Sequence, residues 1–171
     1  MEFFGHTLLW AWCREHGFVL VEGDGPVAPR LAEDTTLTSR ERVVHSAAGD
    51  APVARALADR LAAALGTWDE CLAWATDWDV WANEEDWPRY YAWRARYGER
   101  RSLGAASGHL FGVEDAEALS EFLAHAIGCG WDVTLLPARV SRPTGVRART
   151  SHDGWIEVHA GAPVGFASPA V

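Results

Sequence analysis

Alternating apolar and polar residues on both sides of the sequence SHDG constrain the fold of this chain more than any other feature. A three-residue loop, 152–154, pairs Arg149 with Glu157 and leaves the apolar residues of both flanking segments on one face. A two-residue Asp-Gly turn would pair Arg149 with Val158 and mix the two faces. We therefore predict a C-terminal β-hairpin with strands at 145–151 and 155–160, and with Gly154 in the left-handed conformation of a bulge turn.

Apolar residues at helical spacing, with capping residues before them and glycine after them, predict helices elsewhere in the chain. The expected helices span residues 3–16, 39–47, 51–65, 68–75, 86–97 and 114–127. Those at 39–47 and 68–75 depend on capping boxes, Thr38 with Glu41 and Thr67 with Glu70. Runs rich in β-branched and aromatic residues predict strands at 18–22, 131–137 and 109–111. The predicted fold class is α+β, with five to six helices packed on a small, mainly antiparallel sheet that ends in the C-terminal hairpin.

Length, charge and cysteine content narrow the class of protein. The 171 residues suit a single α+β domain, 1–171, in which 161–171 form an irregular tail. A formal net charge of −9 argues against partners such as nucleic acid or an anionic membrane. The three cysteines are too widely spaced for a disulfide framework and predict free thiols. Because no signal peptide and no membrane-spanning apolar run is recognisable, we expect a cytoplasmic protein.

Residues 67–101 combine many tryptophans with an uneven distribution of charge. Seven acidic residues and no basic residue fall between positions 61 and 88, whereas five arginines fall between 89 and 101. Helical spacing assigns Trp68, Trp74 and Trp93 to buried faces. The tryptophans at 78, 81 and 87 lie in residues 77–87, which we call the acidic segment, where aspartates favour a bend over a helix interior.

The acidic segment has four interpretations. Tryptophan is enriched at the energetic centres of interfaces and carboxylates attract a basic protein, so the segment is predicted to bind a basic partner. Its tryptophans would otherwise pack inward beneath a solvated acidic face, form a homo-oligomer interface, or stack on a carbohydrate. The predicted partner-binding residues are Asp77, Trp78, Asp79, Trp81, Glu84, Glu85, Asp86 and Trp87.

Catalytic motifs give little guidance. The sequence has no Walker loop, no dinucleotide-binding glycine fingerprint and no G-x-S-x-G elbow, and we predict no cofactor. Cys13 and His16 form a single pair without a second one, so no metal site is predicted. The alternative catalytic candidates are His109, and His152 with Asp153, since a histidine beside a carboxylate can act as a general base.

In size, charge and lack of a catalytic motif, the chain resembles small acidic proteins that neutralise a toxin or act as adaptors in bacterial conflict and secretion systems. The resemblance covers no specific residues. The predicted function is that of a non-enzymatic cytosolic binding protein, an immunity or inhibitor protein or an adaptor, whose acidic, tryptophan-rich surface engages a basic protein. The alternative is a small hydrolase-like enzyme with a His–carboxylate site in a tryptophan-lined cleft.

Overall fold

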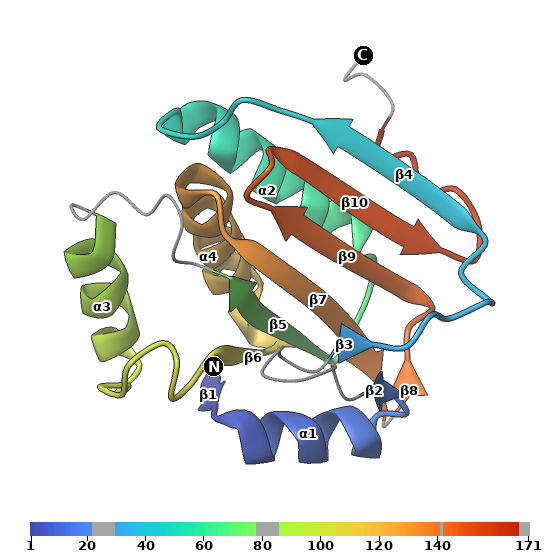
Figure 1. Cartoon of the computed structure of the whole chain (residues 1–171), viewed down its shortest axis with the longest axis horizontal. Helices are drawn as coiled ribbons and strands as arrows, with labels where there is room; N and C mark the ends of the chain where they lie inside the picture. Colours follow the sequence, from blue (N-terminus) through green and yellow to red (C-terminus); the bar gives the residue numbers. More distant parts are fainter. Residues whose placement is uncertain (22–29, 78–85, 141, 168–171) are drawn as a thin grey trace.

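The centre of the protein is an antiparallel sheet, seen in a computed structural model that describes residues 1–21, 30–77, 86–140 and 142–167. Its strand order is β1-β6-β5-β7-β9-β10-β4, and β8 pairs with the end of β7 (Figure 1). Two short strands, β2 (Leu20–Val21) and β3 (Arg30–Leu31), form a separate sheet. The strands of the main sheet are β1 (Glu2–Phe4), β4 (Ser39–Val44), β5 (Glu70–Asp77), β6 (Gly108–Gly112), β7 (Asp132–Arg139), β8 (Arg142–Pro143), β9 (Val146–Ser151) and β10 (Trp155–Ala160).

Four α-helices occur in these described ranges, and a short 3-10 helix, η1 (Val113–Asp115), precedes the last of them. They are α1 (His6–Glu15), α2 (Ala51–Ala64), α3 (Asp86–Arg96) and α4 (Ala116–Cys129). The α+β class and the mainly antiparallel sheet are therefore confirmed. The prediction of five to six helices is wrong, because two of the predicted helices are strands. No helix of the described part of the chain is long and apolar enough to cross a membrane.

The helices cover the two faces of the sheet unequally. Helices α2 and α4 pack on one face and share with it the larger apolar core (Figure 1). On the other face, Leu9 and Trp12 of α1 pack with Leu72, Trp74 and Leu136 of the central strands β5 and β7. Helix α1 lies over this half of the sheet, so the outer face of β9, β10 and β4 carries no helix from the described residues (Figure 1).

The segment predicted as a helix at 39–47 contains the edge strand β4 instead. Residues 39–44 pair with β10 along the whole strand. Val43 packs against the core, whereas Arg40 and Arg42 are exposed, so side chains alternate with the two-residue period of a strand. Pairing with the hairpin outweighs the local capping signal. Glu41 caps no helix and accepts hydrogen bonds from the backbone N–H groups of residues 164, 165 and 167.

The helix predicted at 68–75 is wrong for a different reason. Its residues belong largely to β5, which lies between β6 and β7 and is buried from residue 71 to residue 75. A strand covered on both faces has no polar alternation, and its sequence cannot be told from a buried helix by periodicity. The strand predicted at 18–22 is also misplaced, since among its described residues, 18–21, a strand forms only at 20–21 and pairs with β3 outside the main sheet.

The predicted hairpin register is confirmed. Arg149 pairs with Glu157 and Ala148 with Val158, and Gly154 has a φ of +75° in the connecting turn. A Cβ atom on Gly154 would lie 2.7 Å from the carbonyl oxygen of His45. Glycine is therefore required at this position both by its backbone conformation and by the close approach of the neighbouring chain.

Substitution of Gly154 by alanine is expected to lower the free energy of unfolding by about 2–3 kcal/mol, because the left-handed strain adds to a clash with backbone. Gly49→Ala is the matched control, since Gly49 has a φ of +76° but no atom within 4 Å of the added Cβ. That variant should lose only about 1 kcal/mol. Urea denaturation of both variants measures the difference, and equal losses would show that the contact with His45 is unimportant.

Candidate functional site

The structure describes only the two ends of the acidic segment. Asp77 is the last residue of β5, and Asp86 and Trp87 begin α3. The candidates Trp78, Asp79, Trp81, Glu84 and Glu85 lie outside the described residues. The tryptophans predicted to be buried, Trp68, Trp74 and Trp93, are all in the core, although Trp74 lies in a strand and Trp68 just before it.

Trp87 fixes one end of the acidic segment to the body of the protein. Its ring stacks on that of Tyr91, with centroids 5.9 Å apart, and contacts the buried ring of Trp131 at 5.5 Å. Aromatic contacts of this kind hold a side chain firmly because they bury a large area. Trp87 is thus partly packed rather than wholly available to a partner.

The other end of the acidic segment lies beside a second carboxylate. Asp77 pairs with Asp132 of β7, after a register shift that follows Ala75. The side chain of Asp132 is almost fully buried and accepts hydrogen bonds from the backbone N–H of His152 and from the guanidinium of Arg149. These contacts hold the charge of Asp132 in place below the surface.

His152 and Asp153, two of the alternative catalytic candidates, are close together in the hairpin turn. Nδ1 of His152 lies 3.0 Å from Oδ1 of Asp132, and Nε2 lies 3.5 Å from Oδ1 of Asp153. The hydrogen bond to Asp132, and then the negative charge of that carboxylate, raise the pKa of His152. Sequence reasoning had considered Asp153 as the partner in the turn, but the closer carboxylate is Asp132, twenty residues earlier in the chain.

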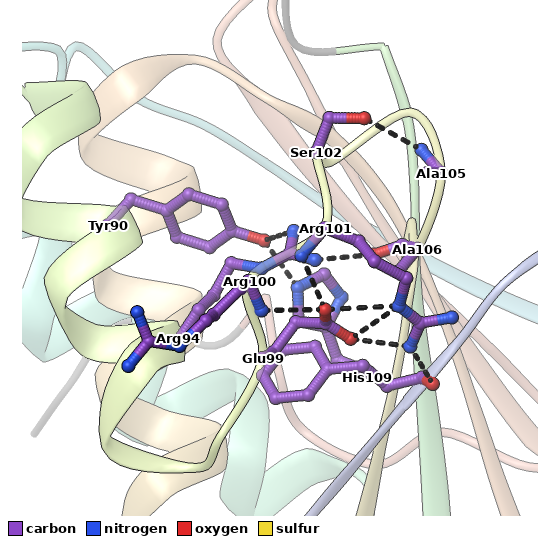
Figure 2. A network of polar contacts seen from close by, with 10 residues as sticks. Tyr90, Arg94, Glu99, Arg100, Arg101, Ser102, Ala105, Ala106 and His109 are labelled. Atoms are coloured by element: carbon purple, nitrogen blue, oxygen red, sulfur yellow. Dashed lines mark hydrogen bonds and ion pairs between the residues drawn. The ribbon is translucent and has the colours of Figure 1, made fainter.

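His109, the third catalytic candidate, is completely buried between the sheet and α3 (Figure 2). Its Nδ1 faces the carbonyl oxygens of Ser107, at 3.1 Å, and Ala73, at 3.3 Å. Carbonyl oxygens can only accept, so Nδ1 carries the proton and Nε2 accepts from the hydroxyl of Tyr90 at 2.6 Å. Burial, followed by the positive charge of Arg94, lowers the pKa of His109 to about 3. His109 is therefore a neutral structural histidine, out of reach of a substrate.

Arg94 completes this buried chain of hydrogen bonds. Its guanidinium donates to the hydroxyl of Tyr90 at 2.9 Å and to the carbonyl oxygen of Ala106 at 3.3 Å (Figure 2). It lies over the ring of Phe3, 4.9 Å from the centroid, and near the rings of Tyr90 and Tyr91. Among the described residues no carboxylate pairs with it, and aromatic faces and two oxygens hold the cation instead.

A separate ion pair, between Glu99 and Arg101, stabilises the loop that follows α3. The carboxylate of Glu99 accepts hydrogen bonds from the guanidinium of Arg101 and from the backbone N–H groups of Arg100 and Arg101 (Figure 2). The hydrogen bond from Arg101 is the main reason why the pKa of Glu99 falls to about 2. Arg101 also donates to the carbonyl oxygen of Phe3, so this pair ties the loop to β1 and is structural.

A cavity of about 900 Å³ lies between the start of α2, one face of α3 and the last turns of α4. Tyr90, Trp93 and Phe122 contribute its aromatic lining, and His125 and Cys129 lie on the α4 side, with Sγ 3.6 Å from Nε2. The carboxyl end of a helix disfavours a thiolate, so this pair is poorly placed to supply a nucleophile. Neither His109 nor His152 lines the cavity. No group of three potential metal ligands is assembled in the described ranges.

The predicted hairpin register places Arg149 and Glu157 on the polar face of the hairpin, and β4 adds to this face two arginines that the sequence prediction missed. The outer face of β9, β10 and β4, which no described helix covers and which we call the open sheet face, carries Arg40 and Arg42 over the buried carboxylate of Glu157 and Arg149 over that of Asp132. Glu157 accepts hydrogen bonds from Arg40 and Arg42 of β4 and from His159 of its own strand, β10. Burial alone would raise the pKa of Glu157, but these hydrogen bonds lower it to about 2. The alternation of arginines in the sequence SRERVV was the available signal.

In comparisons with known proteins, no family model, no curated protein and no solved structure matches the chain significantly.

Proposed function

We propose that this chain is a non-enzymatic binding protein, acting as an immunity or inhibitor protein or as an adaptor, and that its acidic segment engages a basic protein. One observation carries the proposal: seven acidic residues and no basic residue occur between positions 61 and 88. Such a concentration of one charge sign speeds encounter with, and selects, a partner of opposite charge.

The described ends of the segment support this proposal. Asp77 ends a central strand of the sheet, and Trp87 is anchored on Tyr91 and Trp131. A binding segment attached at both ends to rigid elements loses less conformational entropy when it meets its partner than a free tail does.

The alternative enzyme has less in its favour. His152 contacts Asp132 as a general base contacts its orienting carboxylate, but its other nitrogen faces Asp153, and the histidine does not line the cavity. His109 is buried and neutral. We therefore propose no reaction for this chain.

Binding to a purified basic protein that the chain captures from host-cell extract tests the proposal. The variant Asp79→Asn/Glu84→Gln/Glu85→Gln is expected to weaken binding at least about tenfold and to reduce its dependence on salt, because it removes three charges from the acidic segment. Calorimetric titration at two salt concentrations measures both effects.

The matched control removes three exposed carboxylates elsewhere, in Glu2→Gln/Glu15→Gln/Glu117→Gln. It should keep nearly the affinity of the natural protein, since it removes the same number of negative charges but leaves the acidic segment intact. Equal losses in the two variants would mean that overall charge, and not this segment, attracts the partner.

A further inference from the structure

Strand β4 is the last strand on its side of the sheet, and no strand of the described residues pairs with its outer edge, which we call the free edge. Residues 39–44 pair with β10 on one side. On the other side, no described strand lies beside β4 (Figure 1), and no hydrogen bond to the backbone of residues 39–44 comes from any described residue. A free edge presents unpaired N–H and C=O groups, and such an edge is a template for a further strand.

The hydrogen bonds at the end of β4 show which residues face outward. The backbone N–H of His45 donates to the carbonyl oxygen of Gly154, in the register that pairs Val44 with Trp155. Since successive residues of an antiparallel strand point their backbone groups to opposite sides, Val43 and Glu41 also face β10. Arg40, Arg42 and Val44 therefore direct their N–H and C=O groups to the free edge.

The side chains of these same residues make the edge basic. The Arg40 and Arg42 side chains are 60% and 43% exposed, whereas the carboxylate of Glu157 that orients them is 6% exposed. Trp155 lies beside them, with the guanidinium of Arg42 4.3 Å and that of Arg149 5.5 Å from its ring centroid. Solvent meets the guanidinium groups of Arg40, Arg42 and Arg149, while the carboxylates that pair with them are buried, in a protein whose formal net charge is −9.

Charge selects the occupant of this edge. A second copy of the protein could pair its β4 antiparallel to this β4 with the arginine side chains of both copies on the same face of the joined sheet. The two longest registers of this kind place Arg40 of one copy opposite Arg42 of the other, or Arg42 opposite Arg42. Like charges directly opposite each other destabilise strand pairs, and opposite charges stabilise them. The edge therefore rejects its own copy and suits a strand with acidic side chains.

We propose that the free edge of β4 binds an extended acidic segment of a partner protein, which adds a strand to the sheet and places its carboxylates over Arg40 and Arg42. Backbone hydrogen bonds to residues 40, 42 and 44 supply the affinity, and the arginines select the charge. This site lies on the open sheet face, and the acidic segment of the proposed function takes no part in it.

A fluorescein-labelled peptide of four Thr-Glu repeats serves as the probe, since threonine favours strands and glutamate supplies the charge. Saturable binding by fluorescence anisotropy is expected at physiological salt. Hydrogen exchange followed by NMR should slow at the N–H groups of Arg40, Arg42 and Val44 and remain unchanged at Glu41 and Val43, which already face β10. Binding without this alternating protection would overturn the proposal.

Two pairs of variants separate backbone pairing from charge. Val44→Pro removes one outward N–H group without touching a ladder hydrogen bond and should weaken peptide binding about tenfold, whereas Val44→Thr keeps the N–H group and should bind as the natural protein does. Arg40→Gln/Arg42→Gln should also lose at least about tenfold. Arg14→Gln, on exposed α1, is its control and should lose almost nothing.

Other occupants give different results. A second copy would produce a concentration-dependent dimer in analytical ultracentrifugation, with the same three amides protected in the absence of peptide, and would overturn the proposal. A single-stranded DNA of equal charge that binds as tightly as the peptide would overturn it as well, because simple attraction of anions would then suffice. If Val44→Pro fails to fold, the arginine pair and its control still decide the outcome.

Discussion

The free energy of unfolding of this protein is expected to fall by as much as about 5 kcal/mol on acidification because of His109 alone. Burial, followed by the charge of Arg94, lowers the pKa of this histidine from 6.5 to about 3. The unfolded chain takes up a proton below pH 6.5, and the folded protein takes it up only near pH 3. Stability is therefore lost as the pH falls through this window and is fully retained above it.

Other titrating groups change the free energy of unfolding over partly different pH ranges. The pKa of Glu99 and that of Glu157 are lowered from 4.5 to about 2, so the stability that these carboxylates contribute is lost only as the pH falls below 4.5. Between pH 6.5 and 4.5 the histidines dominate. Burial lowers the pKa of His45, as it does that of His109, so through both histidines the protein loses stability as the pH falls below 6.5. The hydrogen bond to Asp132 raises the pKa of His152, so the contribution of that histidine changes only above pH 6.5. A His109 variant is needed to isolate its share.

His109→Gln provides that variant, because its amide offers one donor and one acceptor group but binds no proton. Urea denaturation at a series of pH values measures the slope of the free energy of unfolding against pH. Between pH 6.5 and 4.5 this slope should be smaller in His109→Gln than in the natural protein, by up to about 1.4 kcal/mol per pH unit. Leu8→Gln, at an exposed position of α1 that binds no proton, is the control and should keep the natural dependence. An unchanged dependence in His109→Gln would contradict the assignment.

Local signals in the sequence predicted the elements whose structure is decided locally. The Asp50 side chain accepts from the N–H of Val53 and caps α2, as the sequence around Pro52 indicates. Gly130 ends α4 in the left-handed conformation. The hairpin register followed from the apolar alternation alone, since a shift by one residue would expose its apolar face.

The features that were missed all depend on pairing between distant segments. The alternation in SRERVV is a local strand signal, but the pairing that makes it outweigh the capping box comes from β10, more than a hundred residues later. His109 is covered by Tyr90, which lies on α3 and hydrogen-bonds to it. The carboxylate that contacts His152 belongs to Asp132, on a different strand. Residue types identified the candidate histidines, but only the fold shows that one is buried and that the other is held by a carboxylate that the turn sequence does not contain.

Removal of the Arg94 side chain is expected to be the most damaging single truncation near this network. Arg94→Ala should lower the free energy of unfolding by about 3–4 kcal/mol, because it empties a fully buried site and takes a hydrogen bond from both Tyr90 and Ala106. Chemical denaturation at neutral pH measures this loss.

Arg94→Met distinguishes the charge of this residue from its volume. Methionine fills much of the same space without a buried cation, and a buried charge is often replaced by an apolar side chain at little or no cost. We expect Arg94→Met to stay within about 1 kcal/mol of the natural protein at neutral pH. It should also lose less stability than the natural protein on acidification, since the positive charge of Arg94 contributes to the low pKa of His109. If Arg94→Met were as unstable as Arg94→Ala, the cation and its contacts with Phe3, Tyr90 and Tyr91 would be the stabilising element, and filling the space would not replace them.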